Sequence, residues 1–160
     1  MARTGMAELI LQVRSMANAG TADIVIAGTT YHTDDQLQST LDRHREQIER
    51  ETLAIATDYQ NGTPVYTRYQ WSEPNVERST SGSAAWKIQN GAGSVYAGSA
   101  GTAAADYSVN YDAREITFNS DTNGTTYYLT YRSYDLERAA ADDLAGDAAR
   151  VGAWVCPCVA

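Results

Sequence analysis

The sequence predicts an α+β fold, in which N-terminal amphipathic helices and a C-terminal helix flank a central antiparallel β region. Apolar residues recur at helical spacing near both ends of the chain and with a period of two between residues 52 and 132. Asn-Gly and other turn signals separate the alternating runs. The chain has 160 residues, 43% of them hydrophobic. We therefore expect one domain over residues 1–160, large enough for a hydrophobic core.

The first helix is predicted at about residues 4–19. Thr4 can cap its start and Gly20 can end it. Its apolar stripe consists of Met6, Leu9, Ile10, Val13, Met16 and Ala17. The following run, Ile24 to Ala27, fits either a short strand or an extended link, and the sequence leaves both open.

A second, longer amphipathic helix is predicted at about residues 33–51. Thr33 and Gln36 form a capping-box pattern, with two acidic residues between them where the helix dipole favours negative charge. An apolar face follows at intervals of four, three and four; it consists of Leu37, Leu41, His44 and Ile48. Charged residues of both signs cover the rest of the predicted helix.

From about residue 52 the pattern indicates strands. Residues 52–59 and 65–71 flank a loop with Asn61-Gly62 at its tip, which is a hairpin signal. A weaker pair of strands, 86–88 and 94–96, surrounds a glycine-containing turn. The sequence does not show whether residues 52–105 join one sheet with 107–132 or form a separate lobe.

The stretch Tyr107–Leu144 contains two alternating runs and then an Ala-rich helix. The runs, which end near Phe118 and Arg132, predict a β-hairpin closed by a polar loop. The helix is expected at about residues 134–150, and Leu136, Ala140, Leu144 and Ala148 share one line along it. An apolar tail, residues 151–160, ends the chain.

The net charge of −8 comes from 12 Lys and Arg against 20 Asp and Glu. Binding to a nucleic-acid backbone needs clustered basic residues, so this composition argues against a nucleic-acid-binding protein. The sequence contains no run of about 20 apolar residues that would predict a membrane helix. The first residues also lack the order of a signal peptide, so synthesis in the cytoplasm is expected.

The sequence predicts no catalytic, cofactor-binding or metal-binding residues. Cys156 and Cys158 are separated by one residue, which does not match a zinc pattern, and His32 and His44 add no recognised ligand spacing. His44 fits a core or interface histidine better than a catalytic one. Asp142 and Asp143, like Asp34 and Asp35, are expected in helices, solvated or capping. We therefore expect a protein that is not an enzyme.

Two segments resemble small structural proteins of tailed bacteriophages. Residues Tyr107–Phe118 are followed by Tyr128–Asp142, in which a Tyr-Arg-x-Tyr-Asp-Leu segment (residues 131–136) leads into the Ala-rich helix. The helices expected at 4–19 and 33–51 are similar to the amphipathic pair of head–tail connector, or adaptor, proteins. The resemblance covers the N-terminal quarter and the final third of the chain. The larger β region and the Cys-Pro-Cys ending depart from it.

This resemblance implies a virion structural protein at the head–tail junction. Such subunits form a ring, typically of twelve copies, that binds the portal protein on one side and a neck or tail protein on the other. DNA passes through the lumen without specific binding, which an acidic composition permits. A ring requires a head-to-tail interface, and the hypothesis places Leu37, Leu41, His44 and Ile48 in it. Portal docking is assigned to the tail, through Val151, Trp154, Val155 and Val159.

Other functions remain open at this stage. A tail terminator or another neck protein would give the β-rich middle a larger role. A different class is a small carbohydrate- or ligand-binding β module, in which Tyr66, Tyr69, Trp71 and Trp86 would form a stacking surface. An enzyme is the least favoured function.

Overall fold

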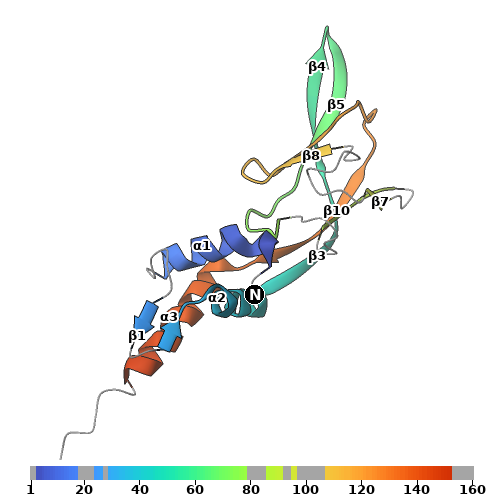
Figure 1. Cartoon of the computed structure of the whole chain (residues 1–160). Helices are drawn as coiled ribbons and strands as arrows, with labels where there is room; N and C mark the ends of the chain where they lie inside the picture. The colour runs from blue at the N-terminus through green and yellow to red at the C-terminus, as the bar shows by residue number, and fades with distance from the viewer. Residues whose placement is uncertain are drawn as a thin grey trace, which may run out of the picture. The chain divides into compact units, whose positions relative to one another are not determined.

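A computed structural model describes most of the chain and confirms the α+β class. The described residues are 3–17, 24–26, 29–78, 86–91, 95–96 and 107–152. The helices are α1 (Ala7–Met16), which follows a 3₁₀ turn (Thr4–Met6), α2 (Asp34–Arg43) and α3 (Leu136–Gly152) (Figure 1). The strands are β1 (Ile24–Ile26), β2 (Thr29–Tyr31), β3 (Arg45–Thr52), β4 (Ala54–Gln60), β5 (Thr63–Gln70), β6 (Trp86–Asn90), β7 (Val95–Tyr96), β8 (Tyr107–Asn110), β9 (Glu115–Phe118) and β10 (Tyr127–Tyr134).

The single domain expected from the length is divided into two compact units. Unit 1 combines Met1–Arg45 with Tyr134–Ala160, and unit 2 is Glu46–Ser133. The N-terminal and C-terminal segments therefore fold together, while the β-rich middle forms a unit of its own. The boundaries fall within β3 and β10.

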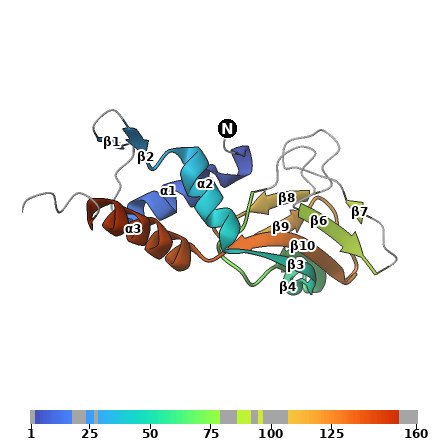
Figure 2. The ribbon, with the colours of Figure 1, turned by 90° about the horizontal axis from the view of Figure 1, so that it is seen from below.

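Unit 1 is built around the three helices, which pack against one another (Figure 2). Its core consists of Met6, Leu9, Ile10, Val13, Leu37, Leu41, Tyr134, Leu136, Ala139 and Ala140. The stripe predicted for the first helix supplies four of these residues. Ala139 and Ala140 face the core with almost no exposed area, so their small side chains allow α3 to approach its neighbours closely. The antiparallel β1–β2 pair shows that the run starting at Ile24 is a strand.

The helix predicted at 33–51 is wrong in its second half. Its start is confirmed, because Thr33 Oγ1 accepts from the Gln36 amide and the Gln36 side chain accepts from the Thr33 amide. The helix ends at Arg43, however, and β3 begins at Arg45. The backbone of β3 pairs with β10, and this long-range pairing overrides the local helical preference of the Arg-Glu-Gln sequence.

The remaining predicted helices are confirmed with small shifts in their ends. The helix expected at 4–19 covers residues 7–16 after its 3₁₀ turn, and that expected at 134–150 covers 136–152. Thr4 does not cap α1; the N-cap residue is Met6, which has no side-chain hydrogen bond. Among the described residues, no helix is long and apolar enough to cross a membrane.

Unit 2 contains two four-stranded antiparallel sheets. The strand orders are β3-β10-β6-β7 and β4-β5-β9-β8. The predicted β4–β5 and β6–β7 pairs are confirmed, but the predicted hairpin of β9 and β10 is wrong. These strands lie in different sheets, with β9 between β5 and β8 and β10 between β3 and β6. Residues 52–105 thus contribute to both sheets, together with strands from 107–132.

An aromatic core lies between the inner faces of the two sheets. Tyr69 and Phe118 from one sheet meet Tyr127 from the other, with ring centroids 4.5–5.4 Å apart. Trp71 and Trp86 are in edge-to-face contact at 5.3 Å. The alternation predicted for β10 is confirmed, because every second residue from Tyr127 to Tyr131 is buried. Large aromatic side chains therefore provide most of the apolar area in this core.

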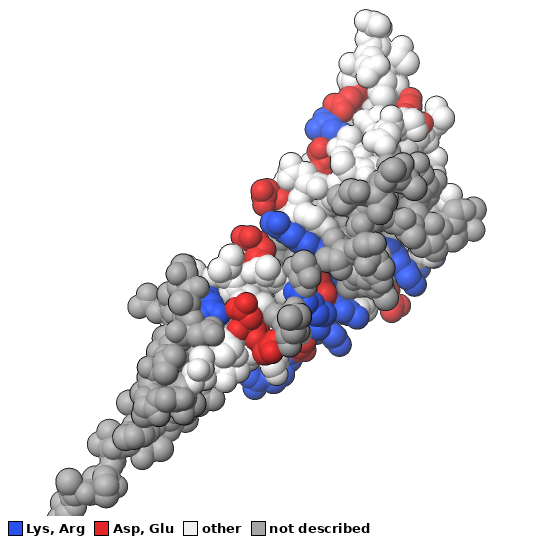
Figure 3. All heavy atoms as spheres, in the orientation of Figure 1, with Lys and Arg blue, Asp and Glu red and all other residues white. Residues whose placement is uncertain are grey.

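The β4–β5 hairpin extends beyond the strand beside it. Only residues 68–70 of β5 pair with β9, so the distal part of the hairpin has no further strand next to β5. Its tip is the predicted Asn61-Gly62 turn, in which both residues have positive φ (51° and 79°), as a two-residue type I′ turn requires. On the face seen in Figure 3 the tip of the β4–β5 hairpin is white, the colour of uncharged residues, because residues 59–67 include no Lys, Arg, Asp or Glu.

Candidate functional site

The apolar face predicted as an oligomer interface does not exist as one helix surface. Leu37 and Leu41 are fully buried in the core of unit 1. His44 is the C-cap residue of α2, and Ile48 lies in β3, half-buried against the core of unit 2. The four residues therefore do not share a face. Leu37 and Leu41 stabilise the fold of the chain itself, because their side chains are enclosed in its core.

The stacking surface suggested for a ligand-binding module is also wrong. Tyr69, Trp71 and Trp86 are at most 5% exposed and belong to the aromatic core. Tyr66 is the one of the four that stays half-exposed.

The structure describes only one of the residues predicted to dock against the portal. Val151 lies in the last turn of α3, and Trp154, Val155 and Val159 lie outside the described residues.

The Tyr-Arg-Ser-Tyr-Asp-Leu segment forms the connection between β10 and α3. Tyr131 and Tyr134 are buried, the former in unit 2 and the latter in unit 1. Asp135 starts the helix, because its Oδ1 accepts a hydrogen bond from the amide of Arg138. The Asp135 amide in turn donates to the carbonyl of His44 at 3.1 Å. Each of these side chains therefore has a structural role at the point where a strand becomes a helix.

Arg132, within the same segment, forms an ion pair with a buried acid. Its guanidinium lies 3.4 Å from Oε2 of Glu77, and Glu77 is only 5% exposed. The amide of Glu77 also donates to the Arg132 carbonyl. A buried carboxylate needs such a partner, so Arg132 keeps the chain around Glu77 attached to β10.

Two buried tyrosines in unit 2 resist ionisation. Burial raises the pKa of Tyr131, and so does its hydrogen bond to Oε2 of Glu51, which places a negative charge beside any tyrosinate. The other carboxylate oxygen of Glu51 accepts from the Ser72 amide. Burial also raises the pKa of Tyr69, whose hydroxyl donates to the carbonyl of Thr125. Both phenols therefore act as neutral hydrogen-bonding groups of the core.

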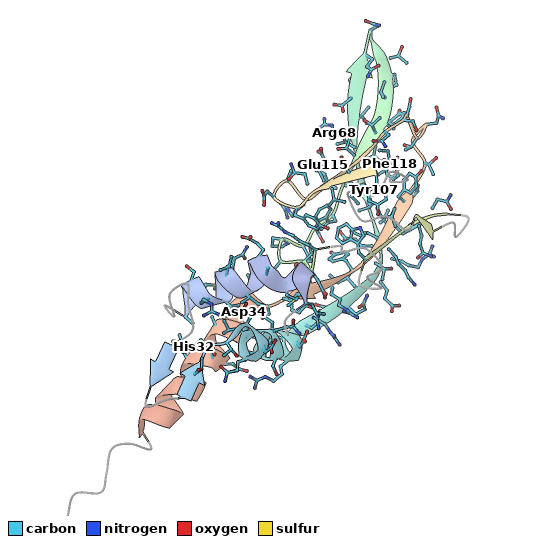
Figure 4. The ribbon with its side chains drawn as sticks, in the orientation of Figure 1. His32, Asp34, Arg68, Tyr107, Glu115 and Phe118 are labelled. Atoms are coloured by element: carbon cyan, nitrogen blue, oxygen red, sulfur yellow. The ribbon has the colours of Figure 1, made fainter. Side chains whose placement is uncertain are left out.

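Two histidine–aspartate pairs in unit 1 connect the two ends of α2 to α3. His32 Nδ1 lies 2.7 Å from Oδ2 of Asp143, and His44 Nε2 lies 2.8 Å from Oδ2 of Asp142. The first pair is largely buried, with side chains 6% and 13% exposed. His32 directly precedes the N-cap residue Thr33 and has a φ of 57°, in the left-handed region. His32 is labelled in Figure 4.

A polar pocket of about 250 Å³ lies beside these pairs. It is lined by His32, Gln36, Ser39, Thr40, Arg43, Asp142 and Asp143. Its polar groups contact one another, since Arg43 donates to Thr40 Oγ1 at 3.0 Å and Asp143 holds His32. The described residues contain no group of three or more His, Cys, Asp and Glu side chains that could hold a metal ion. The arrangement joins α2 to α3 and leaves a small polar recess between them.

Sequence reasoning missed the partners of both histidines. Asp142 and Asp143 were expected to be solvated or capping, but they face the residues before and after α2. Asp142 and Asp143 lie 98 residues or more from their histidines in the sequence. The only available signal was the presence of two consecutive acids on the predicted last helix and two histidines around the second.

A cluster of charged side chains lies on unit 2. Arg68 Nη2 and Nε donate to Asp58 at 2.5 and 2.6 Å, and Nη1 donates to Glu115 at 3.2 Å. The hydrogen bonds from Arg68 lower the pKa of Asp58, and Asp58 raises the pKa of Arg68. Figure 4 labels Arg68 and Glu115. The three residues come from β4, β5 and β9, so the cluster spans one sheet.

No protein-family model, curated protein or solved structure matches the chain.

Proposed function

We propose that the chain is a structural protein of a tailed-bacteriophage virion, a head–tail connector subunit that is not an enzyme. Copies of it would form a ring under the portal protein and continue the DNA channel toward the tail. The ring contact would be head-to-tail between neighbouring copies. The net charge of −8 is compatible with a lumen in which DNA slides without adhering.

The observation that carries this proposal is the Tyr131–Leu136 segment. Together with Tyr107–Phe118 it resembles small structural proteins of tailed bacteriophages, and it forms the capped passage from β10 into α3. The N-terminal helices α1 and α2 pack with α3 in one unit, although α2 ends at Arg43 and so covers only the first half of the helix on which the resemblance to connector proteins was based. The resemblance also assigns portal docking to residues 151–160, of which the first two form the end of α3.

A binding experiment with the portal protein encoded in the same genome tests this proposal. The full chain should bind the portal, and a chain truncated after Arg150 should not. A matched pair of variants locates the effect: Trp154→Ser with Val155→Ser in one protein, and Leu11→Ser in the other. Leu11 is an exposed apolar residue of α1 (50%), so it controls for a general loss of surface hydrophobicity.

Circular dichroism of the truncated chain separates docking from folding. A folded truncated chain without portal affinity supports docking through residues 151–160. An unfolded truncated chain overturns docking through the tail, because those residues would then belong to the core. A full chain that does not bind the portal at all contradicts the connector function.

The β-rich unit 2 favours one second candidate, a tail-terminator or other neck protein. Unit 2, which contains the two sheets and the aromatic core, makes up more than half of the described chain. A protein of this kind would bind the tail tube rather than the portal. The same binding assay with both partners therefore distinguishes the two functions.

A further inference from the structure

Among the described residues, the strand β4 forms an edge of its sheet. Natural sheets protect their edges with charges, bulges or very short strands. The edge strands β7 and β8 have two and four residues, and β3 carries five charged residues and a positive φ at Arg50. By contrast, β4 has seven residues with a single charge, and its one described strand neighbour is β5.

Exposed apolar side chains gather on this strand. Ile55 is 39% exposed and Tyr59 is 72% exposed, and they are the exposed large hydrophobic residues of unit 2 among those described. The β4–β5 pairing contains a register shift: Ala56 pairs with Arg68, and Asp58, two residues further along β4, pairs with Val65, three residues back along β5. The extra residue is therefore on β5. The alternation along β4 is therefore unbroken, and Ile55 and Tyr59 share a face. Ile55 pairs with the buried Tyr69, so this is the core side of the sheet.

The charged face of β4 is already neutralised. Asp58, the only charged residue of the strand, accepts two hydrogen bonds from Arg68. Arg68 is paired across the strands with Ala56, whose methyl group leaves the outer side of β4 open to the guanidinium. Arg68 also donates to Glu115, so the charges on this face are paired within the chain.

We propose that β4 pairs antiparallel with β4 of a second copy of the chain about a twofold axis at Thr57. This register places Ile55 of each copy opposite Tyr59 of the other, a β-branched and aromatic cross-strand pair that covers both exposed side chains. It also places Asp58 opposite Ala56 of the other copy, an uncharged residue. The contact joins two four-stranded sheets into one of eight strands. It is isologous, so it is separate from the head-to-tail contact of a ring and does not rest on the proposed function.

Cross-linking tests the register. In a chain whose Cys156 and Cys158 are replaced by Ser, a single Thr57→Cys substitution should give a disulfide-linked dimer on mild oxidation, because residue 57 faces itself. Ala54→Cys and Gln60→Cys are matched controls on the same strand, and both positions are exposed. Each should remain unlinked alone, and the two substitutions in one chain should link, since 54 faces 60. Equal linking by all single variants, or none by Thr57→Cys, overturns the proposal.

Sedimentation equilibrium on the unmodified full chain tests the contact without cross-links. The proposal predicts a concentration-dependent species of twice the 17.4 kDa mass of the chain. Ile55→Lys with Tyr59→Lys should weaken dimerisation by about tenfold or more, because both cross-strand pairs are lost and four like charges meet. Leu11→Lys, an equally apolar and exposed site on α1, should leave it unchanged. A monomer at all concentrations, or a dimer insensitive to the β4 substitutions, contradicts the proposal.

Discussion

His32 Nδ1 lies 2.7 Å from Oδ2 of Asp143, and the two side chains are among the least exposed polar groups of unit 1. The neighbouring Asp142 is bound to His44 at 2.8 Å but is 45% exposed. One pair is thus removed from water and the other is not, although both connect the same two parts of the chain. Their contributions to stability should differ accordingly.

Asp143→Asn should lower the free energy of unfolding by about 1–3 kcal/mol, because the largely buried hydrogen bond to His32 loses its charged acceptor. Asp142→Asn should lower it by less than about 1 kcal/mol, since solvent screens the exposed pair. Urea denaturation of the two variants measures the difference. Equal losses would mean that burial of the His32–Asp143 pair does not affect its strength.

Leu37→Ala should destabilise the subunit by about 2–5 kcal/mol, because the side chain is fully buried in the core of unit 1 and its removal leaves a cavity. Leu144→Ala is a matched control on α3, where the side chain is 47% exposed, and it should change stability by about 0.5 kcal/mol or less. Thermal or urea denaturation compares them. If Leu37→Ala altered self-association while the fold kept its stability, Leu37 would be an interface residue after all.

Tyr131 and Tyr69 should make the fold sensitive to alkaline pH. Their pKa values are raised in the folded chain, so stability is fully present below the ordinary tyrosine pKa of about 10 and falls as the pH rises above it. In this range the unfolded chain releases protons that the folded chain retains. Denaturation at increasing pH measures the loss.

A spectroscopic titration assigns this effect to a residue. Tyr131→Phe should remove a late step from the ultraviolet titration of tyrosinate and reduce the loss of stability at high pH. If the late step and the loss of stability at high pH persisted in this variant, Tyr131 would not be shielded from ionisation.

Gly62→Ala should destabilise the β4–β5 hairpin by about 1–2 kcal/mol, because the residue has a φ of +79° that an L side chain adopts with strain. No atom lies within 4 Å of the added Cβ, so the cost is conformational rather than steric. Gly91→Ala is the control, with open space and no positive φ. Hydrogen exchange of the hairpin amides reports the difference, and equal protection in both variants would refute the role of the turn.

Local signals predicted the elements whose geometry is set within a few residues. The Thr33–Gln36 capping box and the Asn61-Gly62 turn are of this kind, and the structure contains both. The alternation of Tyr127, Leu129 and Tyr131 also predicted correctly which residues of β10 are buried. In each case the sequence pattern and the backbone conformation involve the same short segment.

Long-range pairing limited the remaining predictions. His44 and Ile48 continue the helical spacing of Leu37 and Leu41, but residues 45–52 form a strand next to β10, about 80 residues away in the sequence. The loop after Phe118 likewise suggested a hairpin, whereas β9 and β10 face each other across an aromatic core. No short pattern specifies which strand pairs with which. The partners of His32 and His44 were missed for the same reason.

Electron microscopy of the full chain mixed with the portal protein of its genome tests the connector function most directly. The account predicts a ring of this chain, with the rotational symmetry of the portal, attached to one end of the portal. Portal particles that carry no added ring at concentrations where the chain is folded would contradict it.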